Sequence, residues 1–300
     1  MENPVLTGAT STTIAIIGGG FSGSLVATHL LKTATQPLTL KLVERSAATG
    51  QGIAYGTGEL GHLLNVSAGN MSAFPQDPGH LLRWLQYNRN ELAALLPEAV
   101  NASTFIPRKV YGLYVQSILE EAEATAPSYV RLERLVDEAI AVQPSGSQAL
   151  VSLVNQGDFL ADRVVLALGN SPVLPDGLLG GGASLVEQNR WGLPAGVLRH
   201  AWSDNALEDL DPETPVLLVG TGLTMVDMVV VLHDRQHRGP IYALSRRGLA
   251  PQRHQASQPY PAFLTPETLP QTAAELVRRV RSEVKTAAGL GYDWRSVTDS

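Results

Sequence analysis

The chain has 300 residues, of which 44% are hydrophobic and 17% are charged, and its formal net charge is −6. This composition is typical of a globular protein, and the length allows two domains with cores of their own. The acidic balance excludes the broad positive field of a nucleic-acid-binding protein. Apolar runs are strand-sized, and no basic leader with an apolar stretch precedes Ile14. We therefore predict a soluble, cytoplasmic protein with no nucleic-acid or membrane partner.

The chain contains no cysteine. Many enzymes that pass electrons between a flavin and a nicotinamide use a redox-active cysteine pair, so disulfide reductases are excluded. Zinc sites built on thiolates are excluded too, and the seven histidines show no spacing with carboxylates that is typical of a metal site. We expect no metal.

A strand, a glycine-rich turn and a helix follow a flexible N-terminus, residues 1–12. The strand Ile14–Ile17 is apolar and β-branched, and the turn has the G-x-G-x-x-G spacing. The first glycine allows the tight turn, the second lets a diphosphate approach the backbone, and the third lets the helix pack on the strand. Such glycines also occur without a ligand, but the strand before and the helix after favour dinucleotide binding. The predicted binding residues are Gly18, Gly20, Phe21, Ser22 and Gly23.

The next predicted strand, Leu38–Val43, ends at Glu44. This fold usually places an acid there on a ribose hydroxyl, and a carboxylate favours a free ribose over a 2′-phosphate. We predict that Glu44 and the adjacent Arg45 contact the adenosine of FAD or NAD. NADP does not fit at this position, because its ribose carries a 2′-phosphate. The alternative is that Glu44 is a solvated strand terminus.

Residues 50–57 and 62–75 combine small, polar and aromatic side chains without a helical period. Structureless segments of this length are usually functional or disordered, and the apolar content argues against disorder. We therefore predict a long loop that surrounds a ligand. Helices are predicted to begin near residues 77–80 and to cover residues 109–124.

A β-rich region follows these helices. Residues 130–154 contain short alternating segments separated by turn sequences, which predicts a β-meander. An apolar strand from Arg163 then returns to the parallel sheet and stops at Gly169, which we include among the cofactor-binding residues. The first domain is predicted to cover residues 1–172, and residues 173–212 to connect it with the second.

A second apolar strand, Val216–Val219, leads into a second glycine turn. Gly220 and Gly222 occupy the first two glycine positions, and we predict that they and Thr224 bind another dinucleotide. Two such units in one chain indicate two dinucleotides, one of which reduces the other. This is the plan of a flavoprotein that takes hydride from a nicotinamide.

Two arginines follow the second strand of the second unit, where the first unit has the acidic residue Glu44. The strand Ile241–Leu244 is followed by Arg246 and Arg247, which suit a ribose 2′-phosphate through bidentate, charge-assisted hydrogen bonds. This favours NADPH over NADH, and the alternative is a solvated basic turn. A doubly wound domain needs a third parallel strand, and only two are evident after residue 213. We therefore expect the domain at residues 213–300 to be incomplete.

The predicted fold class is α/β, with two Rossmann-like, doubly wound dinucleotide-binding domains, the first of which carries the inserted β-meander. Four motifs are more specific than either glycine turn: Ile-Ala-Tyr-Gly-Thr from residue 53, His-Leu-Leu-Asn-Val from residue 62, Met-Ser-Ala-Phe-Pro from residue 71, and Gly-Thr-Gly-Leu-Thr-Met-Val-Asp from residue 220. Together they resemble a bacterial FAD/NAD(P)-binding family of two-dinucleotide flavoproteins related to FAD-dependent urate hydroxylases and aspartate N-monooxygenases. The resemblance assigns FAD to the first domain. It also implies a chain truncated at the C-terminus, because relatives usually continue.

The resemblance implies a reaction as well. NADPH would reduce FAD, and the reduced flavin would trap O₂ as a C4a-hydroperoxide that hydroxylates a small-molecule substrate. The protein would orient the groups and exclude water. The long loop would line the flavin ring with Tyr55, His62, Asn65, Asn70, Met71 and Ser72, of which His62 and Asn65 are the catalytic candidates. A purely structural role is the alternative for His62.

No hydrolase motif occurs in the chain, so the cofactor would carry the chemistry. Three functions stay open. The first is the FAD-dependent, NADPH-oxidising monooxygenase, and the second is an NADPH-flavin oxidoreductase or oxidase that releases peroxide. The third is a truncated, non-catalytic FAD-binding protein. The sequence leaves the substrate and the oligomeric state open.

Overall fold

The computed structural model describes residues 11–169, 207–253, 255 and 257–298. The contacts within the chain divide it into two compact units, Met1–Leu249 and Ala250–Ser300, and each is described by itself. The predicted connecting segment, residues 173–212, lies mostly outside the described residues, and so does most of the predicted flexible N-terminus.

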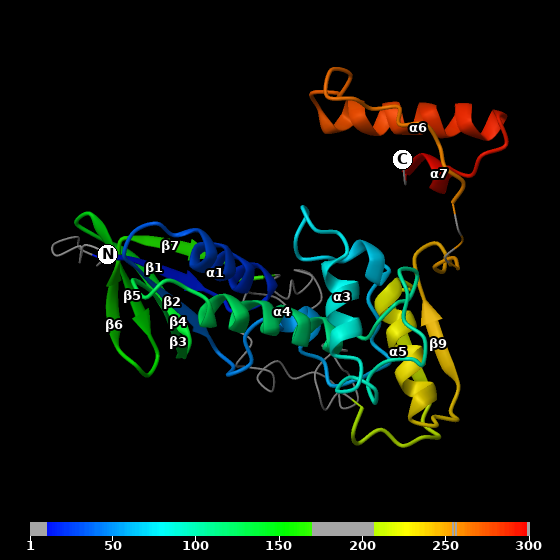
Figure 1. Ribbon diagram of the computed structural model, residues 1–300. Coiled ribbons are helices and arrows are strands. Elements are labelled where there is room, and N and C mark those ends of the chain that lie inside the picture. Colours follow the sequence, from blue (N-terminus) through cyan, green and yellow to red (C-terminus); the bar gives the residue numbers. More distant parts are fainter. Residues whose placement is uncertain (1–10, 170–206, 254, 256, 299–300) are drawn as a thin grey trace. The chain divides into compact units, whose positions relative to one another are not determined.

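A four-stranded parallel sheet with strand order β3-β2-β1-β7 is the frame of the first unit (Figure 1). Its strands are β1 (Thr12–Ile17), β2 (Leu38–Glu44), β3 (Val130–Val136) and β7 (Arg163–Leu166). The two central strands, β1 and β2, alternate between side chains that face helices and side chains that face a second sheet. Both faces are therefore covered, as parallel sheets require.

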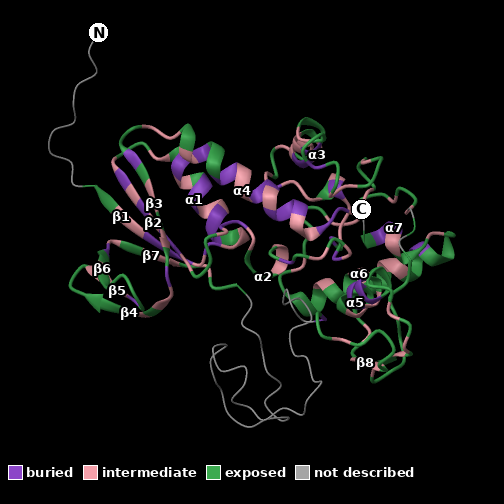
Figure 2. Cartoon of the chain, turned by 90° about the horizontal axis from the view of Figure 1, so that it is seen from below, coloured by how far each residue is buried: buried purple, intermediate pink, exposed green. Residues whose placement is uncertain are grey.

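Two helices cover one face of this sheet. They are α1 (Phe21–Thr33) and α4 (Arg108–Ala124), which lie side by side (Figure 1). Their buried residues pack against the sheet residues Ile16, Leu40 and Leu42, all of which are fully buried. Figure 2 shows buried residues along both helices and the strands beneath them. Burial of aliphatic side chains at this interface is the main stabilising contribution to the layer.

An antiparallel sheet covers the other face. It consists of β4 (Ala139–Ser145), β5 (Gln148–Leu153) and β6 (Asp158–Ala161), and its Val151 and Leu153 pack against Ala15 and Ile17 of β1. The prediction of a meander over residues 130–154 is wrong for its first segment. That segment is β3, which pairs in parallel with β2 from Leu38–Val130 to Glu44–Val136. The physical reason is the preceding helix α4, because a helical crossover returns the chain in the parallel direction.

The predicted long loop contains α2 (Gly52–Tyr55) and the short 3-10 helix η1 (Ala68–Asn70), and α3 (His80–Tyr87) follows it. Two backbone hydrogen bonds join the loop to the segment before α4: Leu64 N donates to Ile106 O at 2.9 Å, and Ala68 N donates to Thr104 O at 2.9 Å. Farther along, the Tyr114 hydroxyl accepts from Ala73 N at 3.2 Å and lies 2.7 Å from His80 Nδ1. The loop is therefore fixed along its length to α4.

The second glycine turn joins β8 (Val216–Val219) to α5 (Leu223–Asp234), and β9 (Ile241–Leu244) follows. β8 and β9 pair in parallel, and their residues Val216, Leu218 and Ile241 pack against α5. The order of strand, turn, helix and parallel strand thus confirms the prediction from the sequence. In the unit from residue 250 onward, α6 (Ala273–Gly289) packs against α7 (Trp294–Thr298).

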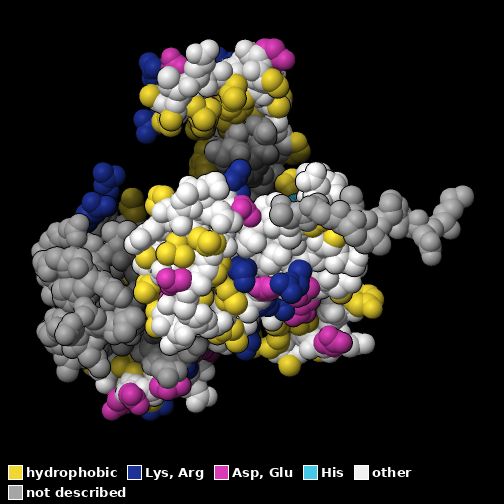
Figure 3. Space-filling model, turned by 90° about the vertical axis from the view of Figure 1, so that its left-hand side faces the viewer, with side chains coloured by type: hydrophobic (Ala, Val, Ile, Leu, Met, Phe, Trp, Pro, Cys, Tyr) yellow, Lys and Arg dark blue, Asp and Glu magenta, His cyan; other side chains and the backbone are white. Residues whose placement is uncertain are grey.

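The charged side chains do not form a large patch of one sign on the face that Figure 3 shows, where acidic and basic groups lie next to each other. Ion pairs on the first unit include those of Glu133 with Lys41 and with Arg131. Among the described residues, no helix is both long enough and apolar enough to cross a membrane.

We expect Gly23→Ala to lower the free energy of unfolding by about 2 kcal/mol or more, because an added Cβ would lie 1.9 Å from the Gly18 carbonyl oxygen. Chemical denaturation followed by circular dichroism measures the change. Gly289→Ala, at the end of α6, is the matched control because its added Cβ meets nothing within 4 Å. Equal stability of the two variants would show that helix α1 does not need this close approach.

Candidate dinucleotide-binding sites

The first glycine turn is tightly packed at its first and third glycines. Gly18 has a φ of +104°, and its N–H donates to Val43 O at 2.8 Å. A Cβ at Gly18 would lie 2.2 Å from Ala167 O, and a Cβ at Gly23 would lie 1.9 Å from Gly18 O. Any other residue at either position would force the backbone apart. The protein itself therefore requires these two glycines.

The middle glycine is different, because the space beside it is open. Gly20 is the N-cap of α1, no side chain caps the helix, and an added Cβ would meet only Gly52 at 3.5 Å or more. The backbone N–H groups of the first helical turn have no acceptors within the helix. Together with the helix dipole, they favour an anion at this end. The turn therefore fits the diphosphate of a dinucleotide.

Glu44 lies at the edge of this turn. Its Oε2 accepts from Gly19 N at 2.7 Å, while Oε1 accepts from Arg45 N at 2.8 Å and from Ser46 N at 3.4 Å. These backbone donors orient the carboxylate, which keeps capacity for a further donor such as a ribose hydroxyl. The side chain of the neighbouring Arg45 is exposed.

An aromatic cluster borders the turn. The ring centroid of Tyr55 lies 6.0 Å from that of Phe21 and 4.7 Å from that of Tyr111. Burial raises the pKa of Tyr55, although the positive charge of Arg108 acts in the opposite direction, and burial also raises the pKa of Tyr111. Both phenols are therefore neutral near pH 7. Ser22, by contrast, is exposed.

The structure buries His62 and exposes Asn65, the two catalytic candidates. His62 is only 1% exposed, and its Nδ1 lies 2.6 Å from Thr57 Oγ1. Burial is the largest effect on this ring and lowers the pKa of His62, so the ring is neutral near pH 7. Its backbone oxygen accepts from Arg108 N at 2.8 Å. These contacts fit the structural role that the sequence left open.

The remaining candidates on the loop have different surroundings. Asn70 is exposed, and Met71 packs partly buried against the core between α3 and α4. Ser72 Oγ lies 2.6 Å from Asp77 O and accepts from Phe74 N at 3.1 Å, so this hydroxyl holds the turn before α3. Of these three residues, Asn70 and Met71 keep polar or polarisable groups that these contacts do not occupy.

The second glycine turn repeats the backbone geometry of the first. Gly220 has a φ of +111°, and its N–H donates to Leu244 O at 2.8 Å, as Gly18 does to Val43 O. Gly222 is the N-cap of α5 with φ −82° and ψ −171°, close to the −70° and −163° of Gly20. No side chain caps α5 either. The chain therefore has two similar helix N-termini that can accept a diphosphate.

The second turn is more open than the first. A Cβ at Gly220 or Gly222 would meet nothing within 4 Å, and Thr224 is exposed. Arg246 and Arg247, which follow β9, are exposed as well. Such side chains can reach a phosphate without breaking contacts in the core. Gly169, with a φ of +68°, ends the first part of the described chain and is also exposed.

Two residues that the sequence analysis missed lie near the candidates. Arg108, the first residue of α4, is close enough to influence the pKa values of Tyr55, His62 and Asp227. Asp227 is 8% exposed, and burial raises its pKa while Arg108 lowers it. A signal existed in the sequence, since a basic residue just after a proline at a helix start opposes the helix dipole.

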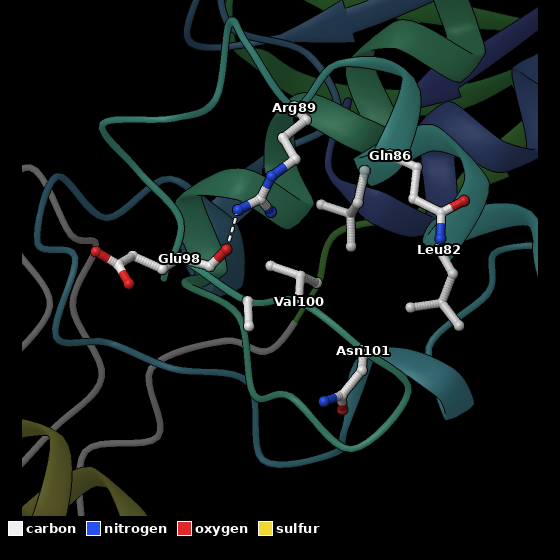
Figure 4. A pocket seen from close by; sticks show the side chains of 8 residues that line it. Leu82, Gln86, Arg89, Glu98, Val100 and Asn101 are labelled. Atoms are coloured by element: carbon white, nitrogen blue, oxygen red, sulfur yellow. Dashed lines mark hydrogen bonds between the residues drawn. The ribbon is translucent and has the colours of Figure 1, made fainter.

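A pocket of about 320 Å³ lies elsewhere in the first unit, between α3 and residues 98–101 (Figure 4). Arg89 donates to the carbonyl oxygen of Glu98 at its rim. None of the predicted cofactor-binding residues lines this pocket. Within the described parts of the chain, no group of three or more histidine or acidic side chains could hold a metal ion.

Two curated proteins with sequences similar to this chain are L-aspartate N-monooxygenases (nitrosuccinate-forming) from Streptomyces cremeus and Streptomyces davaonensis. The first is 28% identical over 296 residues, which cover 85% of this chain and 40% of the relative. The second is 28% identical over 254 residues, which cover 73% of this chain and 38% of the relative. The chain thus spans about two fifths of the length of these relatives.

Solved structures of similar chains include an ornithine N-hydroxylase from Kutzneria sp. 744 and a closed form of cyclohexanone monooxygenase. The first is 18% identical, covers 78% of this chain and 53% of that chain, and has a TM-score of 0.46. The second is 15% identical, covers 92% of this chain and 45% of that chain, and has a TM-score of 0.47.

A family profile described as FAD-NAD(P)-binding matches residues 15–171, which include the first glycine turn, the long loop and the parallel sheet. The match covers more than half of the chain. The chain therefore belongs to the FAD-NAD(P)-binding protein family.

Proposed function

We propose that this protein is an FAD-dependent, NADPH-oxidising monooxygenase that hydroxylates a small molecule with O₂. The observation that carries the proposal is the repeated glycine turn, in which Gly18 and Gly220 have φ values of +104° and +111° and make the same hydrogen bond to the following strand. Two dinucleotide sites in one chain suit the transfer of hydride from one cofactor to the other. The names of the two curated relatives support a monooxygenase.

Each turn has a separate binding task in this proposal. The N-terminus of α1 at Gly20 would hold the diphosphate of FAD, and Glu44 would accept from a ribose hydroxyl. The N-terminus of α5 at Gly222 would hold the diphosphate of NADPH. Arg246 and Arg247 would pair with the 2′-phosphate. Bound FAD would supply the redox chemistry, since it accepts hydride from a nicotinamide and passes electrons to O₂.

The chain's own residues would exclude water from the flavin. Phe21, Tyr55 and Tyr111 form an apolar wall beside the first turn, and both phenols stay protonated. The loop that includes Met71 is fixed to α4 and so would present a stable surface. Exclusion of water matters because reduced flavin that reacts with O₂ in an open site yields only peroxide.

The test is a visible spectrum of the purified chain before and after anaerobic NADPH. We expect flavin absorbance near ~450 nm that NADPH bleaches and O₂ restores. Peroxide is then measured against NADPH consumed while candidate amino acids are added, and less peroxide with a suitable substrate supports the monooxygenase. Peroxide equal to NADPH with every candidate would favour an oxidase. Flavin that NADPH never bleaches would contradict the proposal.

We expect Gly20→Val to remove bound FAD without unfolding the chain, because the valine would fill the open space at the α1 N-terminus while its nearest backbone neighbour lies 3.5 Å from the Cβ. Gly222→Val is the matched control, since it places the same side chain at the other helix start. It should keep the flavin absorbance and lose NADP⁺ binding. Stoichiometric flavin in Gly20→Val would refute the assignment of the first site.

We expect Arg246→Ala combined with Arg247→Ala to weaken NADPH binding about tenfold or more and NADH binding little, because only NADPH carries the 2′-phosphate. Titration of both nucleotides, followed by flavin or nicotinamide fluorescence, measures the two affinities. Arg238→Ala is the control, since this exposed arginine precedes β9 and pairs with Glu213. Equal losses for NADPH and NADH would make the two arginines structural.

A further inference from the structure

The segment Thr57–Leu64, which we call the strap, is joined to the start of α4. His62 O accepts from Arg108 N at 2.8 Å, and Leu64 N donates to Ile106 O at 2.9 Å. The Thr57 hydroxyl lies 2.6 Å from the His62 ring and closes the strap on itself. The strap is therefore part of the FAD-binding half of the first unit.

The same strap contacts α5, the helix that follows the second glycine turn. A Cβ at Gly61 would lie 3.0 Å from Val230 Cγ1 and 3.2 Å from Asp234 Oδ2. Glu59 Oε1 forms an ion pair with Arg235 Nη2, just after the end of α5. Gly61 thus lies in close contact with α5, and the Glu59–Arg235 ion pair adds a charged contact beside it.

A buried acidic residue lies on α5 nearer the glycine turn. Asp227 is buried on α5, and its Oδ2 has no hydrogen-bond partner among the described residues. A buried carboxylate without an opposite charge is costly. Arg108, whose backbone N–H donates to His62 O of the strap at 2.8 Å, is the basic residue whose positive charge lowers the pKa of Asp227 against the effect of burial.

Arg108 lies at an electrostatically unfavourable position in its own helix. Arg108 and Lys109 begin α4, and no acidic residue lies in that first turn. Two positive charges at a helix N-terminus are unfavourable with the helix dipole. A carboxylate from α5 offsets this cost.

We propose that Arg108 and Asp227, together with the Glu59–Arg235 ion pair, are positioning residues that hold α5 and its glycine turn at the FAD-binding half for hydride transfer. The inference rests on the proposed function, since it assigns these groups to the arrangement in which NADPH reduces FAD. None of the four side chains needs to touch the reacting atoms.

The contact itself is tested without cofactor through a disulfide. The native chain has no cysteine, so Gly61→Cys with Val230→Cys introduces the only two thiols. An added Cβ at Gly61 would lie 3.0 Å from Val230 Cγ1, which is one bond from Val230 Cβ, so the two Cβ atoms are within reach of the separation of about 3.5–4.5 Å that a disulfide needs. We expect rapid intramolecular crosslinking under mild oxidation, measured by intact mass and thiol titration. Gly157→Cys with Val230→Cys is the control, because Gly157 lies on the β5–β6 hairpin and a Cβ there meets nothing within 4 Å.

The positioning role is tested by the rate at which NADPH reduces the flavin in stopped flow. We expect Asp227→Asn to slow reduction about tenfold with unchanged flavin content, whereas Asp209→Asn, an exposed carboxylate, has no effect. Glu59→Arg or Arg235→Glu alone should slow reduction, and the double exchange should restore it. Adding the 61–230 disulfide to Asp227→Asn should also restore the rate, because the crosslink replaces the lost attraction.

The outcomes separate this inference from the proposed function. Wild-type flavin that NADPH does not reduce would refute both, whatever the crosslink shows. Wild-type reduction at a normal rate, combined with no crosslinking of the 61–230 pair, would overturn the inference alone. So would a crosslinked protein that NADPH cannot reduce, or an Asp227→Asn variant that is reduced as fast as the wild type.

Discussion

The first unit depends on the close approach of two glycines. A Cβ on Gly23 would lie 1.9 Å from the carbonyl oxygen of Gly18, and Gly18 in turn lies against Ala167 after β7. This packing brings the N-terminus of α1 to the ends of β1 and β7, the strands between which a doubly wound sheet opens its ligand crevice. The helix N-terminus that we propose as the diphosphate site, the acid at Glu44 and the aromatic cluster beside the turn all take their positions from that contact.

The long loop forms fixed walls for the candidate site beside the first glycine turn. Hydrogen bonds to the segment before α4 fix the loop at Leu64 and Ala68, and Tyr114 fixes it again at Ala73. Few contacts in the loop come from regular secondary structure, so its conformation depends on α4. A change in the packing of α4 would therefore reach the loop as well as the face of the sheet that α4 covers.

Local spacing was enough to predict the elements around each glycine turn, because the turn, the helix and the next strand are close in sequence. The same reasoning failed at β3, whose alternating residues suit an antiparallel meander as well as the edge of a parallel sheet. Arg108 and Asp227 could not be paired from the sequence, since only the folded chain brings their helices together. Burial of His62 likewise depends on contacts that its neighbours in sequence do not reveal.

The hydrogen bond between Tyr114 and His80 has a consequence for the imidazole. The Tyr114 oxygen accepts from Ala73 N and lies 2.7 Å from His80 Nδ1, and burial raises the pKa of this phenol, so it stays protonated near pH 7. Burial also lowers the pKa of His80. The imidazole is therefore neutral near pH 7, and the contact between α4 and the start of α3 joins two uncharged groups, which a rise of pH above neutrality does not alter.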